Sequence, residues 1–432
     1  MIIFLIYFLF LAEIILSLKS LKLGLYLYLA IRLVLPTTAR LGSISLNSAC
    51  ILVVLTIFFL KEKMNIRKTS LFPFPLLVLP LFLLGLFAKT PISFQFSELM
   101  QFTLTELIPF FLMLNIIRDE DKNRCCQLIY ISFIIIGIYG IISFFLPYNI
   151  LYMSFYDIFR VGTVYEISDE ALSMGALNGR ATGNTSGGII WGQICLIVTS
   201  FALFDGDSNK KLRNAVVFLG SLNCLLCTKR SALVPLTLIL LIYLLQRLSK
   251  INLKSIAVIL SMIMAVLILQ SFFPDIFERN FIAALKFWDD RAAESAGLHG
   301  STFNMRMEQA TYLNQMISSC ALQGFGFNYP TYYVQVYHGI HPFMLGFESI
   351  YFSAVASSGY IGFIVWMFFF LRIYKKTTAI NRQYRYVHLT YIISIFMSGI
   401  QSTLWLYLVI VALMFLKEER GNRSNVQTVN ID

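Results

Sequence analysis

The strongest constraint on the fold is a succession of apolar runs, each about 14 to 20 residues long, separated by short charged clusters. Each run is close to the length that an α-helix needs to cross a bilayer core of about 30 Å. The chain is 58% hydrophobic and only 13% charged, which is unlike an ordinary soluble globular domain. The pattern therefore predicts an all-α polytopic integral membrane protein, with residues 1–432 forming one membrane domain.

We expect about 12 to 13 transmembrane helices from these runs. The last apolar run is long and is interrupted by the sequence SGIQS, so it predicts two short helices. The predicted spans lie at residues 1–18, 22–38, 43–60, 71–88, 98–117, 127–147, 187–204, 214–228, 231–246, 254–272, 347–371 and 387–416.

The distribution of basic residues predicts the orientation of these spans. Of the 34 Lys and Arg residues, 23 lie in one set of segments, which assigns this set to the cytoplasm. The set comprises the loops at 19–22, 61–70, 118–124, 205–213, 247–254 and 372–386 and the tail at 417–432. The net charge of +11 then reflects membrane topology rather than binding to nucleic acid. Two long connections fall on the external side, at 148–186 and 273–346, and long connections in compact proteins are usually functional.

Two cations occupy a short external turn. Lys229 and Arg230 lie between two short apolar runs whose other ends are basic and predicted to be cytoplasmic. Charges at membrane depth usually face a polar cavity or a partner, although long side chains also extend to lipid headgroups. The turn is therefore either a snorkelling pair or an anion site, in which Arg230 is the better ligand because its planar fork matches phosphate oxygens.

Further arginines lie in the long external connections. Arg180 precedes a Gly- and Ser-rich turn that opens onto the next span, and a helix N-terminus favours anions. This pattern indicates a lipid-linked phosphate, although a simple helix start capped by Asn184 or Ser186 would also explain it. The external arginines are Arg160, Arg180, Arg279, Arg291 and Arg306.

The order of four motifs resembles the O-antigen polymerase and ligase superfamily, which includes the Wzy-type polysaccharide polymerases. RATG at 180–183 is similar to the Arg-x-x-Gly that closes the first long external loop of the family, and TKRSA at 228–232 to its external turn. NMRMEQATYLNQMISSCALQGFGFN at 304–328 resembles the Arg-bearing helix that ends in Gly-x-Gly. FESIYFSAVASSGYIGFIVWM at 347–367 resembles the span with Gly-x-x-Gly.

The resemblance implies a glycosyltransferase that joins oligosaccharide repeat units carried on undecaprenyl diphosphate, at the periplasmic face of a bacterial cytoplasmic membrane. It implies no cofactor and no metal, because arginines would neutralise the leaving diphosphate. Arg230, Arg180, Arg306 and Lys229 would bind this diphosphate, with Arg160 and Arg291 as further candidates. The lipid bilayer and a chain-length-determinant membrane protein are the expected partners.

The general base is expected to be Glu348 or His341. Glu348 could instead be a carboxylate that only pairs with an arginine, and His341, before Pro342, could have a structural role in its loop. Glu106, inside an apolar run, is a candidate for the site or a packing partner of a cation. His338 is a further candidate.

Two other functions share this sequence pattern. An O-antigen ligase would transfer glycan to lipid A-core, but ligases of the family typically carry His-Asn where this chain has Glu348 and Ser349. A transporter or flippase of lipid-linked oligosaccharides would more often show two related halves, and none is evident in the sequence. We therefore favour the polymerase, with the ligase as its nearest rival.

Overall fold

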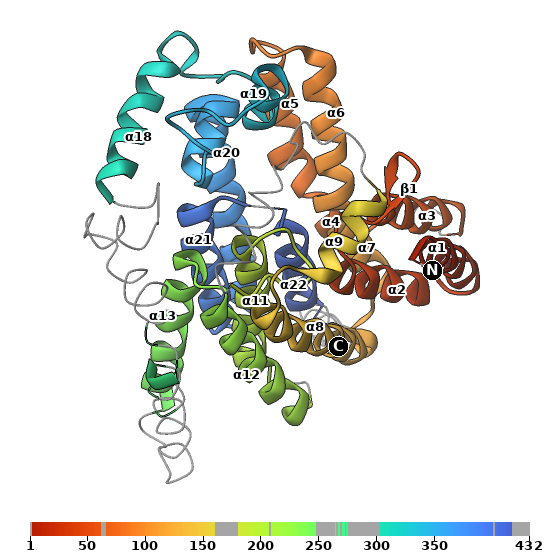
Figure 1. Cartoon of the computed structure of the whole chain (residues 1–432). Coiled ribbons are helices and arrows are strands. Elements are labelled where there is room, and N and C mark those ends of the chain that lie inside the picture. Colours follow the sequence, from red (N-terminus) through yellow and green to blue (C-terminus); the bar gives the residue numbers. More distant parts are fainter. Residues whose placement is uncertain are drawn as a thin grey trace, which may run out of the picture.

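The computed structural model describes residues 2–61, 66–159, 180–206, 209–247, 303–400 and 402–416, with a few single positions between 264 and 274. These residues form helices and one small β-hairpin (Figure 1). The elements are α1 (Ile2–Lys19), α2 (Leu21–Val34), β1 (Arg40–Leu41), β2 (Ile44–Ser45), α3 (Leu46–Lys61), α4 (Lys68–Leu71), η1 (Phe74–Val78), α5 (Leu79–Gly85), α6 (Ile92–Phe102), η2 (Thr103–Leu107), α7 (Ile108–Ile116), η3 (Asp119–Asp121), α8 (Lys122–Phe145), α9 (Ile150–Ile158), α11 (Gly188–Phe204), α12 (Lys210–Leu226), α13 (Arg230–Arg247), α18 (Phe303–Met316), η6 (Ser318–Cys320), α19 (Tyr329–Tyr337), α20 (Ile350–Ile380), α21 (Tyr384–Ser398) and α22 (Leu404–Phe415).

The prediction of an all-α multi-pass membrane protein is confirmed. Within the described ranges, five helices are long and apolar enough to cross a membrane, and several shorter apolar helices accompany them. The run divided by SGIQS forms the two helices α21 and α22, as predicted. The predicted span at 254–272 lies mostly outside the described residues. The five long segments are Ile2–Lys19, Lys68–Gly85, Ile92–Ile116, Asp119–Phe145 and Ile350–Ile380.

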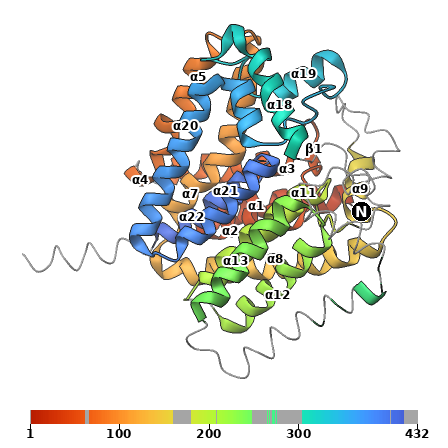
Figure 2. The same cartoon turned by 90° about the vertical axis from the view of Figure 1, so that its left-hand side faces the viewer.

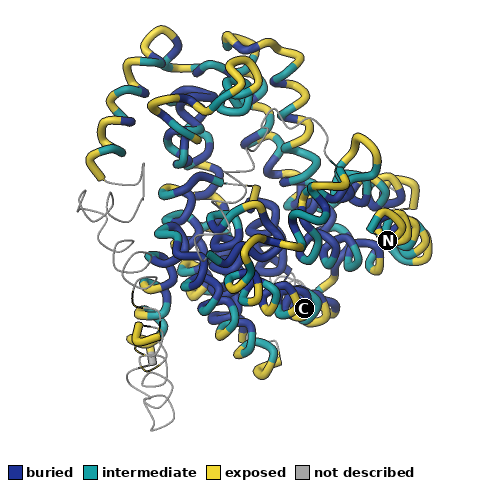
Figure 3. The backbone as a smooth tube through the Cα atoms, viewed as in Figure 1, coloured by how far each residue is buried: buried dark blue, intermediate teal, exposed yellow. Residues whose placement is uncertain are grey.

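The centre of the bundle contains a helix, α22, that is apolar on every side. All twelve residues of α22 are buried, and Figure 3 shows the same burial through the middle of the molecule. The buried Gln193 of α11 joins this core to the turn between α21 and α22. Its Nε2 donates to the carbonyl oxygen of Gly399 at 2.8 Å, and its Oε1 accepts from Thr403 at 2.8 Å. The buried amide is thereby satisfied, and it holds the turn in place.

Loops that are predicted to share one side of the membrane contact each other. The ammonium of Lys22 lies 2.5 Å from a carboxylate oxygen of Asp121, and both loops are assigned to the cytoplasm. At the opposite end, the amide of Thr90 donates to the carbonyl oxygen of Phe325 at 2.8 Å. Figures 1 and 2 place α18 and α19 at this same end, where the rings of Tyr332 in α19 and Phe94 in α6 lie 5.2 Å apart.

Helix α20 differs from the straight span predicted at 347–371, because the chain folds back at Gly359. This glycine has φ +67° and ψ −171°, which breaks the helix. The rings of Tyr351 and Phe363 lie 5.3 Å apart, whereas a straight helix would separate them by about 18 Å. Residues 350–358 therefore form a short helix that packs beside the start of the longer segment 360–380.

The two glycine motifs meet at this reversal. The amides of Phe325 and Gly326 donate to the carbonyl oxygens of Ala356 and Ser357, at 2.9 and 2.8 Å. These bonds satisfy carbonyls that the end of the short helix would otherwise leave unpaired. A Cβ at Gly359 would lie 2.3 Å from the carbonyl oxygen of Leu322, so only glycine fits. Gly-x-Gly and Gly-x-x-Gly thus build the fold-back that the sequence patterns did not predict.

We expect Gly359→Ala to lower the free energy of unfolding by at least about 1–3 kcal/mol, because alanine is strained at positive φ and would collide with backbone. Gly206→Ala is the matched control, since a Cβ there would meet no atom within 4 Å. Thermal unfolding of both variants in detergent measures the difference. Equal melting temperatures for the two variants would show that the reversal tolerates a side chain.

Candidate functional site

The RATG segment is fixed against three helices. The amide of Ala181 donates to the carbonyl oxygen of Leu226, at the end of α12, at 2.9 Å. Nδ2 of the buried Asn149, which caps α9, donates to the carbonyl oxygen of Gly183 at 2.7 Å. Gly183 has φ +52°, and a Cβ there would lie 2.4 Å from the ring of Trp191 in α11. These contacts position the half-buried Arg180 beside the turn between α12 and α13.

The TKRS segment forms that turn. Thr228 has φ +53°, and α13 begins at Arg230. The carbonyl oxygen of Lys229 accepts from the amides of Ala232 and Leu233 at 2.9 and 3.0 Å, which is the bonding of a helix start. The two cations therefore lie where the chain reverses between two short helices, as the sequence predicted.

Arg306 brings a third element to the same place. Its guanidinium, on α18, donates to the carbonyl oxygen of Glu348 at 2.6 Å and to the Oε2 atom of that residue at 3.3 Å. It also donates to the carbonyl oxygen of Met397, near the end of α21, at 3.4 Å. One arginine therefore holds α18, the start of α20 and the end of α21 together.

Four cations and one carboxylate lie close enough for their charges to interact. Arg180 and Glu348 both act on Lys229, and Arg306 acts on Arg230. We call this group the cationic cluster: Arg180, Lys229, Arg230, Arg306 and Glu348. Its positive charge exceeds its negative charge, which suits an anionic ligand with several oxygens.

The burial of two cations in the cluster is not fully compensated by partners among the described residues. Nε of Arg180 is buried and has no hydrogen-bond partner among the residues that the structure describes. Burial lowers the pKa of Lys229 to about 8, and the nearby Arg180 acts in the same direction while Glu348 opposes it. A bound diphosphate would accept a hydrogen bond from Nε of Arg180 and would favour the protonated form of Lys229.

We expect the affinity of the cationic cluster for a diphosphate ester to be constant between pH 7 and about 8 and to fall above that, because Lys229 then loses its proton. The fall is at most about tenfold per pH unit. Lys229→Arg should flatten this profile, because arginine stays protonated. Binding titrations from pH 7 to 10 measure the effect, and an identical fall in both proteins would assign the titration to another group.

Both histidine candidates lie in the connection between α18 and α20. His341 is buried, and its Nδ1 accepts from the amides of Phe343 and Met344 at 3.2 and 3.1 Å. Its ring packs against Tyr333 at a centroid distance of 4.8 Å. Desolvation lowers the pKa of His341. His338 is exposed and has φ +51° where α19 ends. These contacts support the structural interpretation of His341.

Glu106 is paired with a cation inside the bundle. Its Oε1 accepts from Arg32 at 3.0 Å, and its Oε2 accepts from the amide of Trp405 at 2.8 Å. Arg32 also lies 4.2 Å from the ring centroid of Trp405. The contacts agree with the packing role that was considered for Glu106. Removing one partner from a buried pair usually destabilises the fold, because it leaves an uncompensated charge.

Some candidates lie outside the described residues. These are Arg160, Arg279 and Arg291, together with the tail at 417–432, residues 160–179 of the first long connection and residues 275–302 of the second. Within the described ranges, no group of three or more His, Cys, Asp or Glu side chains is placed to hold a metal ion.

Sequence reasoning missed a polar stripe on α6 and η2. Glu98, Gln101 and Thr105 recur at helical spacing in an otherwise apolar span, so they share one helix face. They line a cavity of about 460 Å³ whose opposite wall includes Ser353 and Ser357 of the fold-back segment. The helical spacing of polar residues was the available signal, but the partner wall depends on the reversal at Gly359.

The helices and this site define a multi-pass membrane protein with a cationic cluster at one end of its bundle. Residues 215–367 match the family model described as O-antigen ligase, which confirms the resemblance to the O-antigen polymerase and ligase superfamily. Members of this family are glycosyl-transferring enzymes. The match includes Lys229, Arg230, Arg306 and Glu348, whereas Arg180 precedes it. A comparison with curated proteins found no match.

Proposed function

We propose that this protein polymerises undecaprenyl-diphosphate-linked oligosaccharide repeat units into a surface polysaccharide, at the periplasmic face of a bacterial cytoplasmic membrane. The observation that carries the proposal is the cationic cluster, in which four cations come from three separate parts of the chain and two of them, Lys229 and Arg306, interact with the carboxylate of Glu348. Such an arrangement suits a ligand with two phosphate groups beside a group that accepts a proton.

The cations would hold the diphosphate of the lipid that carries the growing chain. Arg230 and Arg306 offer planar forks, and Arg180 offers a buried Nε that needs an acceptor. As the bond between the anomeric carbon and the phosphate oxygen breaks, negative charge grows on the diphosphate. Fixed cations stabilise that charge without reorganising, so the step needs no metal ion.

Glu348 would receive the proton of the attacking hydroxyl. The hydroxyl oxygen of the incoming repeat unit bonds to the anomeric carbon, its proton moves to the carboxylate, and undecaprenyl diphosphate leaves with the electron pair. The Glu348 side chain is 39% exposed, so a ligand can reach it. Among described residues only Arg306 hydrogen-bonds its side chain, through Oε2, which leaves Oε1 for the hydroxyl.

The ligase is the second candidate, because the matched family model carries that description. A ligase would use the same donor and the same cationic cluster, and would differ only in the acceptor. The pair Glu348 and Ser349, where ligases typically carry His-Asn, supports the polymerase.

The purified protein should convert one defined undecaprenyl-diphosphate oligosaccharide into a ladder of products that differ by one repeat unit. A parallel reaction contains lipid A-core as the alternative acceptor. A ladder without lipid A-core supports the polymerase. Product that forms only on lipid A-core would replace it by the ligase, and no product with either acceptor would contradict both.

A further inference from the structure

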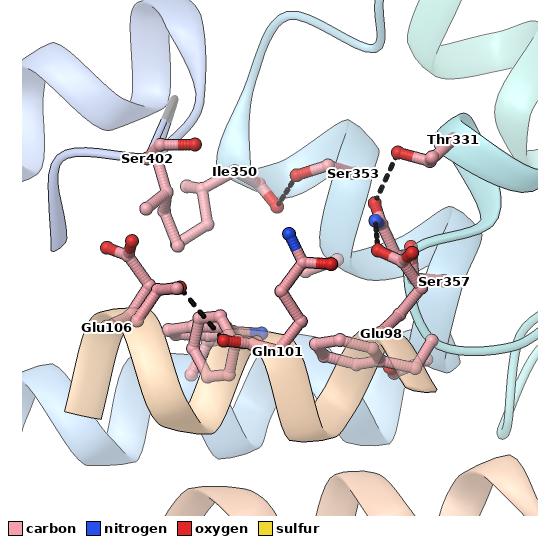
Figure 4. Close-up of a pocket in the computed structure, with 16 residues that line it drawn as sticks. Glu98, Gln101, Glu106, Thr331, Ile350, Ser353, Ser357 and Ser402 are labelled. Atoms are coloured by element: carbon pink, nitrogen blue, oxygen red, sulfur yellow. Dashed lines mark hydrogen bonds between the residues drawn. The ribbon is translucent and has the colours of Figure 1, made fainter. Parts of the chain in front are cut away.

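The cavity between α6, η2 and the short first segment of α20 differs chemically from the cationic cluster. Its volume is about 460 Å³, which is within the range of pockets that bind small ligands. Figure 4 shows Gln101 projecting from its helix toward the space between Ile350 and Ser353. We call it the serine-lined cavity, after Ser353, Ser357, Ser358 and Ser402 in its walls.

The polar groups of the cavity favour hydroxyls over phosphates. No Lys or Arg is among the described residues that line it. Glu98 accepts from Nδ2 of Asn328 at 2.6 Å, and its carboxylate would repel a diphosphate. The second lining carboxylate, Glu106, is already paired with Arg32. Carboxylate, amide and hydroxyl side chains can all accept hydrogen bonds from sugar hydroxyls.

One wall of the cavity is aromatic. The ring centroid of Phe102 lies 5.6 Å from that of Phe327 and 5.9 Å from that of Trp366, in edge-to-face arrangements. A sugar ring has an apolar C–H face and a rim of hydroxyls. Aromatic rings beside a few placed polar groups therefore match a glycan better than they match a lipid tail or a free anion.

The cavity adjoins the cationic cluster through two shared segments. Ile350, in the cavity wall, lies two residues after Glu348. Ile400 and Ser402 belong to the turn that follows Met397, whose carbonyl oxygen accepts from Arg306. A sugar in the cavity would thus be next to the proposed base, while a diphosphate would be on the cationic side.

We infer that the serine-lined cavity binds the sugar portion of the incoming repeat unit, which carries the attacking hydroxyl, with Glu98 and Gln101 as hydrogen-bonding partners. This inference rests on the proposed glycosyl transfer, and it assigns the acceptor sugar to a site separate from the donor diphosphate. The cationic cluster would hold the donor by its diphosphate, and the cavity would hold the acceptor by its uncharged sugar. Each substrate is then fixed in its own orientation, which positions the hydroxyl against the anomeric carbon.

The test measures binding of two probes to the purified full-length protein in nanodiscs. The first probe is a mixture of lipid-free, phosphate-free oligosaccharides released from the surface polysaccharide of the organism that encodes the chain. The second is undecaprenyl diphosphate without sugar. The variants are Gln101→Leu, Glu98→Ala and Arg230→Ala. Ser97→Ala, one residue before Glu98 on an exposed position of α6, is the matched control.

We expect Glu98→Ala to weaken oligosaccharide binding about 10- to 100-fold, as for a hydrogen bond to a charged group, and Gln101→Leu about 3- to 10-fold. Both variants should bind undecaprenyl diphosphate like the wild type. Arg230→Ala should show the opposite pattern, and Ser97→Ala should change neither. Unaltered melting temperatures establish that the variants are folded.

Oligosaccharide binding that Glu98→Ala and Gln101→Leu leave unchanged, or no binding to the wild type, would overturn the assignment of the cavity. That result is distinct from failure of the proposed function. If the cavity variants lose oligosaccharide but the ladder assay gives no polymer, the cavity binds glycan and the polymerase is wrong. If a ladder forms and the cavity variants bind normally, only the cavity assignment fails.

Discussion

Arg230→Ala is expected to lower polymer formation by at least about 10²-fold, as removal of one donor from a charge-stabilising site typically does. Arg230 stands at the first position of α13, with Arg306 close enough for their charges to interact. Its guanidinium would therefore contact the diphosphate just as the negative charge develops there. The ladder assay measures the rate, and size-exclusion chromatography of the purified variant verifies insertion and folding.

Two further variants identify the reason for this loss. Arg230→Lys keeps the charge but lacks the planar fork, so it should restore only a small part of the activity. Arg382→Ala removes an exposed arginine from the connection between α20 and α21, which is predicted to be cytoplasmic, and should behave like the wild type. Full activity in Arg230→Ala would refute the assignment of Arg230 to the diphosphate.

Glu348→Gln is expected to lower the rate by about 10²–10⁴-fold, the typical loss when a general base is removed. The amide keeps an oxygen for Arg306, which also donates to the backbone of residue 348, so the local structure is retained. A carboxylate that only formed a partly exposed ion pair would contribute about 0–1 kcal/mol, or several-fold at most. The rate at which the first repeat unit is added in the ladder assay therefore distinguishes a general base from a residue that only forms an ion pair.

Glu308→Gln, on an exposed position of α18, is the matched control for the loss of one carboxylate. A Glu348→Gln variant that retained more than about a third of the wild-type rate, as a lost surface pair would allow, would eliminate Glu348 as the base. His341→Ala would then be the next variant to assay, although Nδ1 of His341 already accepts two backbone amides.

Much of the cationic cluster could be predicted from the sequence, because its members occur at chain reversals. Arg230 lies between two short helices whose far ends are basic, which assigns the turn to one side of the membrane. Arg180 precedes a Gly-rich helix start, and a cation at such a position is evident without a structure. The segments predicted to share a side do lie together, so these turns converge.

The serine-lined cavity could not be predicted in the same way. From the sequence, Ser353 and Ser357 are polar positions in one straight span, because hydropathy depends on composition and does not show where a helix reverses its direction. The reversal depends on Gly359, which has no Cβ and can therefore adopt a positive φ and let Ala321 and Leu322 approach its backbone closely. Those residues are nearly forty positions earlier in the chain, and a local pattern contains no information about such a contact.

The sequence by itself determined the class of fold and the sides on which the loops are expected, since burial of apolar helices and the placement of basic residues depend on local composition. It also indicated which cations would form an anion site. Only the tertiary structure decided that Arg306 joins Glu348 to α21, that Glu106 pairs with Arg32, and that α20 folds back to close a cavity. These contacts join residues far apart in the chain, so they follow from the packing of helices against each other and not from any single helix.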